Sequence, residues 1–168
     1  MILTIIMIIS LILDGLLTNY LPFMINDLSL FTPLLTLVTI FIIYPYFRKK
    51  EKKYFIMLLI IGLLYDLLYT NLIFFNAIMF LGIGYISKII YKNYEINYFN
   101  LILYTVLLVV IYESVTALIF FIFNLVPITI PKVVYKITHS LLLNIIYAEI
   151  IYITIKLIPK KYLKISIN

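Results

Sequence analysis

Long apolar runs, separated by short charged or polar segments, make up most of this sequence. Stretches without Asp, Glu, Lys or Arg extend over residues 1–13, 15–26, 28–47, 54–65, 67–87, 96–112, 114–131 and 137–148. Several of these stretches join across a single acidic residue. Because a hydrocarbon core about 30 Å thick requires about 20 apolar residues per helix, the pattern predicts six membrane-spanning helices, at about 2–21, 28–47, 54–70, 72–91, 98–124 and 133–157.

The proline residues fall where this division needs interruptions. All six lie in the expected connections or within about two turns of a span end, where a missing backbone N–H costs least. The alternating pattern of a barrel strand is absent, and an open strand edge in lipid would leave backbone groups unpaired. We therefore expect an all-α integral membrane protein in which residues 1–168 form one transmembrane domain, a six-helix bundle. Five spans with one interfacial segment are the alternative.

Composition excludes the main classes of soluble protein. Hydrophobic residues make up 65% of the chain and charged residues 12%, whereas soluble globular proteins use about 25% charged residues. Outside the expected spans no stretch exceeds about a dozen residues. This leaves no room for a nucleotide-binding domain, a globular hydrolase or a nucleic-acid-binding module. Since the chain has no Cys, disulfides and thiolate metal sites are excluded as well.

The positions of the basic residues predict orientation rather than nucleic-acid binding. Eleven of the 13 Lys and Arg residues fall between spans two and three, between spans four and five, or after span six. Because Lys and Arg near span ends are retained in the cytoplasm, both termini are expected there. The first segment lacks a basic start and a cleavage site, so it is expected to be a retained span. The topology anchors are the basic residues Arg48, Lys49, Lys50, Lys52 and Lys53.

Acidic residues inside the expected spans are the candidates for a functional site, because charge is expensive in a membrane. Counted from the inner end of each span at 1.5 Å per residue, three of the four lie about 18 to 22 Å deep, in the outer half. Amide side chains of spans four and six reach a similar depth. We therefore expect an outer-half polar cluster for partner binding or helix packing, formed by Asp14, Asp66, Asn76, Glu113 and Asn144. Water exposure, or a purely structural pairing with a neighbouring Tyr, Ser or Asn, is the alternative.

Catalytic and cofactor sites find little support. The sequence has no Ser, His and Asp arrangement, no H-E-x-x-H motif and, with four Gly, no phosphate-binding loop. His139 stands without a second His or a Cys to complete a metal site. Glu149 is expected near the inner mouth of span six. Tyr residues cluster at span ends, as an interfacial aromatic belt does.

One internal similarity concerns the first and third spans. Five residues, beginning with Asp14 and ending with Phe23, recur at a constant offset of 52, beginning with Asp66 and ending with Phe75. Both copies close an outward-going span. The similarity suggests that the two acids occupy equivalent depths, and an ancient hairpin duplication is one explanation of it.

A set of motifs in fixed order carries a resemblance to a known family. They are Asp14, Asp27, the segment Gly62-Leu63-Leu64-Tyr65-Asp66, the pairs Asn76-Ala77, Gly84-Tyr85 and Tyr112-Glu113, and the segment from Ser140 to Asn144. In this order and spacing they resemble the rod-shape-determining membrane protein MreD family. The resemblance extends over nearly the whole chain. The sequence departs from the family in its scarcity of Ala and Gly, which makes helix packing through small residues less certain.

The resemblance implies a non-enzymatic scaffold of the bacterial cell-elongation complex, which synthesises peptidoglycan, located in the cytoplasmic membrane and without a cofactor. It implies binding to the bitopic protein MreC, close to MreB, RodA and a class B penicillin-binding protein. The implied fold is similar to the six-helix substrate-binding components of energy-coupling-factor transporters. A small-molecule-binding component of such a transporter is therefore the alternative function, in which the acids face a ligand pocket. A proton or cation pathway fits less well, because carboxylates at one depth form a ring and not a relay.

Overall fold

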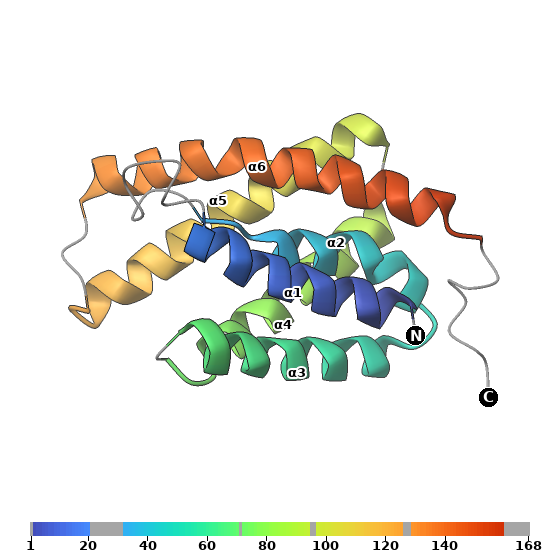
Figure 1. Ribbon diagram of the computed structural model, residues 1–168, viewed down its shortest axis with the longest axis horizontal. Coiled ribbons are helices and arrows are strands. Elements are labelled where there is room, and N and C mark those ends of the chain that lie inside the picture. The colour runs from blue at the N-terminus through green and yellow to red at the C-terminus, as the bar shows by residue number, and fades with distance from the viewer. Residues whose placement is uncertain (1, 21–31, 71, 95–96, 126–128, 160–168) are drawn as a thin grey trace.

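Six helices form the described part of the fold. The computed structural model describes residues 2–20, 32–70, 72–94, 97–125 and 129–159. Within these ranges every regular element is an α-helix, which gives the all-helical class that the sequence predicts. The helices, shown in Figure 1, are α1 (Ile2–Tyr20), α2 (Leu35–Phe47), α3 (Glu51–Tyr69), α4 (Phe75–Asn93), α5 (Tyr98–Ile122) and α6 (Ile130–Leu157).

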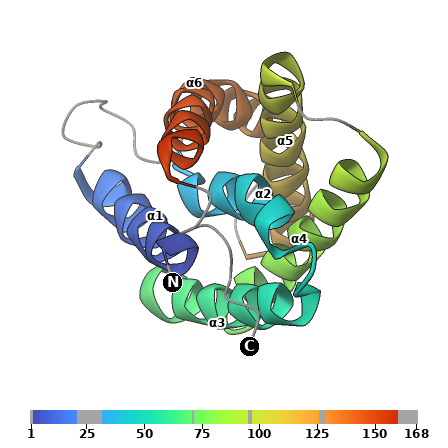
Figure 2. The same ribbon diagram turned by 90° about the vertical axis from the view of Figure 1, so that its right-hand side faces the viewer.

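Helix α2 lies at the centre of the bundle. Every side chain from Leu35 to Tyr44 is buried, and the helix contacts each of the other five helices. Figure 2, which looks along the bundle, shows the other helices arranged around α2. A helix that is apolar on all sides is typical of such a position. The core of the molecule is therefore built around α2.

The two ends of the bundle differ in charge. Figure 1 shows the first turn of α1, the turn between α2 and α3, and the last turn of α6 at the right-hand end. The turn between α3 and α4 lies at the opposite end. We call the right-hand end the basic end, because it contains Arg48, Lys49, Lys50, Lys52 and Lys53. The fold thus gathers at one end the segments that the charge pattern predicts to share one side of a membrane.

The start of α2 differs from the sequence prediction. The expected span began seven residues earlier, but the first helical residue is Leu35, and the three residues before it are not helical. Side chains of α6 accept hydrogen bonds from the backbone N–H groups of this stretch. Thr32 N–H donates to Ser140 Oγ at 3.0 Å, and Leu34 N–H donates to Asn144 Oδ1 at 2.9 Å. Backbone groups bound in this way no longer need helical partners.

The remaining helices begin and end within three residues of the expected bounds. The whole of the expected first connection, with Asp27, and the first four residues of the expected second span fall within residues 21–31, which lie outside the described residues. Among the helices that the structure describes, α1, α5 and α6 are long and apolar enough to cross a membrane, by length and composition, and α2 is apolar but shorter. Large aliphatic side chains point outward, such as Ile9 on α1 and Leu142 on α6, which are 49% and 70% exposed. Such a surface fits contact with lipid.

Candidate functional site

The carboxylate of Asp14 binds the N-terminus of α2. Asp14 is buried on α1, and its Oδ1 accepts a hydrogen bond from Leu35 N–H at 2.7 Å while Oδ2 accepts one from Thr36 N–H at 2.9 Å. The first N–H groups of a helix have no partner within that helix, and a negative charge is favourable next to them. A side chain of α1 therefore supplies the cap of α2 and joins the two helices inside the bundle.

Asp66 plays the same part for α4. It is buried near the end of α3, and its Oδ1 accepts hydrogen bonds from both the backbone N–H and the side-chain amide of Asn76, each at 2.9 Å. Oδ2 accepts a hydrogen bond from Ala77 N–H at 3.2 Å, and the Thr70 hydroxyl donates to Oδ1 at 3.0 Å. The N-cap residue itself, Phe74, offers no side-chain cap. Asp66 thus satisfies the helix start that local sequence leaves open.

The two carboxylates, 52 residues apart, have equivalent surroundings. Each lies late in one helix and accepts two consecutive backbone N–H groups from the next. Each is followed four residues later by a Thr whose hydroxyl donates to the Asp carbonyl, at 2.7 Å for Thr18 and Asp14 and at 3.3 Å for Thr70 and Asp66. The helix pairs α1–α2 and α3–α4 therefore repeat one pattern of contacts.

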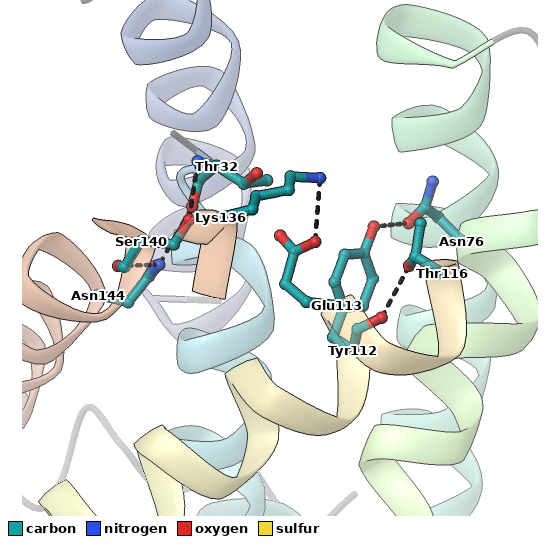
Figure 3. A network of polar contacts seen from close by, with 8 residues as sticks. All are labelled: Thr32, Asn76, Tyr112, Glu113, Thr116, Lys136, Ser140 and Asn144. Carbon is teal, nitrogen blue, oxygen red and sulfur yellow. Dashed lines mark hydrogen bonds and ion pairs between the residues drawn. The ribbon is translucent and has the colours of Figure 1, made fainter. Parts of the chain in front are cut away.

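Helix α6 binds the same end of α2 from another side. Asn144 is fully buried, and its amide group donates to Thr32 O at 3.2 Å and to Ser140 O at 2.8 Å. Figure 3 shows Thr32, Ser140 and Asn144 next to one another. Since Asn144 accepts from Leu34 and Asp14 from the following two residues, three consecutive backbone N–H groups are bound by side chains of α6 and α1.

A second group of contacts links α4, α5 and α6. The Tyr112 hydroxyl donates to Asn76 Oδ1 at 2.7 Å. The next residue, Glu113, is 2% exposed, and its Oε2 lies 2.9 Å from Nζ of Lys136 on α6. Figure 3 shows Tyr112 directed toward Asn76 and Glu113 directed toward Lys136. Oε1 of Glu113 is buried and has no hydrogen-bond partner among the described residues.

The five predicted cluster residues therefore lie in two buried groups. Asp14 and Asn144 meet at the start of α2, and Asp66 and Asn76 meet at the start of α4. Glu113 stands beside the second group through its neighbour on α5. Each of the five is at most 2% exposed. Their partners are mostly backbone N–H groups at helix starts and side chains of adjacent helices. The two groups therefore join helices to one another, and we call them the polar joints.

Two features of this region are not predicted from the sequence. Ser10 Oγ lies 2.7 Å from Thr39 Oγ1 and 2.6 Å from Tyr147 OH, and all three groups are buried between α1, α2 and α6. Ser10 stands one turn before Asp14, and this helical spacing is the signal that the sequence offers for it. The second feature is the pairing of Glu113 with Lys136, for which the sequence offers only their common outer position.

The anchor residues Arg48 to Lys53 lie around the turn between α2 and α3, where α3 is also tied to α4. Glu51 Oε2 lies 2.6 Å from Lys88 Nζ, and Tyr44 OH donates to Glu51 Oε1 at 3.1 Å. The hydrogen bond from Lys88 holds the pKa of Glu51 below its usual value. Only the ionised carboxylate makes this pair, so its contribution to stability is lost as the pH falls through that lowered pKa.

Metal binding has no support in the part of the chain that the structure describes. No group of three or more His, Cys, Asp or Glu side chains there could hold a metal ion. His139 is exposed on α6 and stacks on Tyr135, with ring centroids 3.6 Å apart. Glu149 is half-buried further along the same helix.

Fold and site together define a class of protein: an all-helical membrane protein whose buried carboxylates and amides join its helices. A family model described as rod shape-determining protein MreD matches residues 1–162. The chain belongs to the MreD family, which confirms the resemblance that the motifs indicate and implies a role in the determination of rod shape. Comparisons with curated proteins and with solved structures give no match.

Proposed function

We propose that this protein is a non-enzymatic membrane scaffold of the bacterial cell-elongation complex, which synthesises peptidoglycan, and that it binds the bitopic protein MreC. In this role it lies near MreB, RodA and a class B penicillin-binding protein, and it requires no cofactor. The family match over residues 1–162 is the observation that carries the proposal.

The contacts of the buried acids support a scaffold more than a transporter component. In the transporter alternative Asp14 and Asp66 would turn their carboxylates toward a small molecule. Instead, all four of their carboxylate oxygens accept hydrogen bonds from the chain itself, at the starts of α2 and α4. Charge used in this way stabilises the arrangement of the helices. The likeness of the fold to substrate-binding components of energy-coupling-factor transporters stays a prediction.

The proposal includes an orientation. All six helices cross the cytoplasmic membrane, and the basic end, with both termini, faces the cytoplasm. Two observations support this orientation. The anchor residues and the paired Lys88 lie at one end of the bundle, and at the same end helix α1 begins and helix α6 ends. The polar joints then lie in the outer half of the membrane, where a bitopic partner can reach them.

The test is to purify the tagged protein from its own host in mild detergent and to identify co-purifying proteins by mass spectrometry. An unrelated tagged membrane protein with six spans, expressed at the same level, serves as the control. Specific recovery of MreC together with RodA or the penicillin-binding protein is the expected result. Recovery of paired ATPases with a coupling membrane subunit, without MreC, would replace the scaffold with the transporter component.

A further inference from the structure

Glu113 differs from the other two buried carboxylates of the candidate site. Asp14 and Asp66 have both oxygens bound, whereas Glu113 has one oxygen in an ion pair and one, Oε1, buried without a partner among the described residues. The side chain is 3% exposed. A buried acceptor that lacks a donor costs free energy, and the cost is larger for a charged group. Glu113 therefore has an unfilled position for a hydrogen-bond donor.

The group that now pairs with Glu113 can leave. The side chain of Lys136 is 33% exposed, in the second turn of α6. A long, flexible ammonium side chain near a helix end can turn its charge to the membrane surface at little cost. Figure 3 shows Lys136 extending from α6 across to Glu113, with a dashed line that joins Nζ to one of the two carboxylate oxygens. Lys136 thus covers the carboxylate without satisfying it.

The chemistry of the unfilled position selects its ligand. A lone carboxylate repels anions, and it cannot by itself hold a metal ion, for which the described residues offer no group of ligands. An ammonium group acts as a point charge on one oxygen, whereas a guanidinium group presents a planar fork of donors that binds both oxygens of a carboxylate. Exposed residues near the pair in sequence, such as Leu118 on α5 and Val134 on α6, are apolar, so the carrier of the guanidinium must itself suit a membrane.

We propose that Glu113 is a binding site for a guanidinium group carried by the membrane-spanning segment of a partner protein. The incoming Arg displaces Lys136 and donates to both carboxylate oxygens, and Lys136 turns toward the membrane surface. This inference rests on the proposed function, because it requires a bitopic partner, and it names the residue and the chemistry of contact.

Three variants test the site. Glu113→Gln removes the charge and nearly keeps the shape, so recovery of the bitopic partner is expected to fall at least tenfold. Lys136→Arg gives the protein its own guanidinium group, which competes with the partner's Arg for Glu113, so recovery of the partner is also expected to fall. Lys136→Met removes the competitor, and recovery is expected to stay equal or rise. Each variant is co-expressed with the tagged partner, and the ratio of the two proteins after purification is measured together with the melting temperature in detergent.

A purely structural ion pair gives the opposite result for the two Lys136 variants. It predicts that Glu113→Gln and Lys136→Met lose recovery together and that Lys136→Arg keeps it, and this pattern would overturn the proposal. Equal recovery for the wild type and all three variants would overturn it as well, and would leave the proposed function standing. Failure of the wild type to recover the partner would overturn both.

The identity of the incoming group is tested on the partner. Each Arg and Lys at the outer end of the partner's spanning segment is replaced by Leu. Each of these partner variants is measured once with the wild-type protein and once with the Glu113→Gln variant. For the contacting residue the two losses should not add, because either change alone removes the whole contact. The free energy of interaction in this double-mutant cycle is then clearly different from zero for one residue and close to zero for the others. Additive losses at every position would contradict the contact.

Discussion

Asp66 accepts four hydrogen bonds inside the bundle, and two of their donors are backbone N–H groups at the start of α4. Such groups find no substitute partner in an apolar environment, where each unsatisfied one costs about 1–3 kcal/mol. Hydrogen bonds from several donors therefore offset the free-energy cost of burying the carboxylate. Asp14 shows the same balance at the start of α2 with two donors.

This balance predicts the effect of Asp66→Ala. The change leaves the N–H groups of Asn76 and Ala77 without their acceptor, so we expect a loss of about 3 kcal/mol in the free energy of unfolding. In detergent the melting temperature should fall by several degrees. In a host that carries only the variant, cell elongation should fail although membrane insertion is intact. Rod-shaped cells at normal protein level would remove Asp66 from the functional residues.

The close approach of α3 and α4 beside Asp66 gives a second prediction. A Cβ added to Gly62 would lie 2.8 Å from Ala77 N and 2.9 Å from Asn76 O, both backbone atoms that a side-chain rotation cannot move. Gly62→Ala should therefore separate the two helices and cost about 1–3 kcal/mol. Gly82→Ala on α4 is the matched control, because nothing lies within 4 Å of its Cβ. Equal melting temperatures for the two variants in detergent would contradict the close approach.

At the scale of the elements, apolar runs predict which segments are helical, and contacts between helices decide where they start. Helix α2 begins at Leu35 because Asn144 binds the N–H group of Leu34, 110 residues away in the sequence, and Asp14 binds that of Leu35. The local sequence pattern does not predict contacts with residues so far away in the chain. The same limit applies to the site: charge inside a span identifies Asp14, Asp66 and Glu113 as candidates for a polar cluster, but most of the groups that they contact lie on other helices.

The turn between α2 and α3 carries a prediction about insertion. Replacing Arg48, Lys49, Lys50, Lys52 and Lys53 with Gln removes the five cations that, in the proposed orientation, retain this turn in the cytoplasm. A reporter fused within the turn should then show an increased fraction on the outside. Lys132→Gln, at the opposite end of the bundle, should leave the reporter signal as it is. An unchanged signal after the fivefold replacement would contradict an orientation set by charge.

At the scale of the whole molecule, the polar joints and the basic end lie apart along the bundle. Lys88 and Glu51 pair at the basic end, and the start of α4, with Asp66, lies at the other end of the same helix. A helix of 19 residues at 1.5 Å per residue is about 28 Å long, close to the thickness of a hydrocarbon core. One helix therefore connects the charged end of the bundle with a buried polar joint, over a length close to that thickness.

This separation predicts which positions face each side of the membrane. The chain has no native Cys, so single cysteines can be introduced without further change. With six spans, Lys49→Cys and Lys92→Cys should react with a membrane-impermeant maleimide only after the cells are opened, whereas Ile73→Cys and Lys132→Cys should react in intact cells. With five spans and one interfacial segment, the positions on one side of that segment change sides. If that segment is α3, α4 or α5, Lys49→Cys and Lys92→Cys would differ from each other, or Ile73→Cys would differ from Lys132→Cys. Either difference would contradict the six-span bundle.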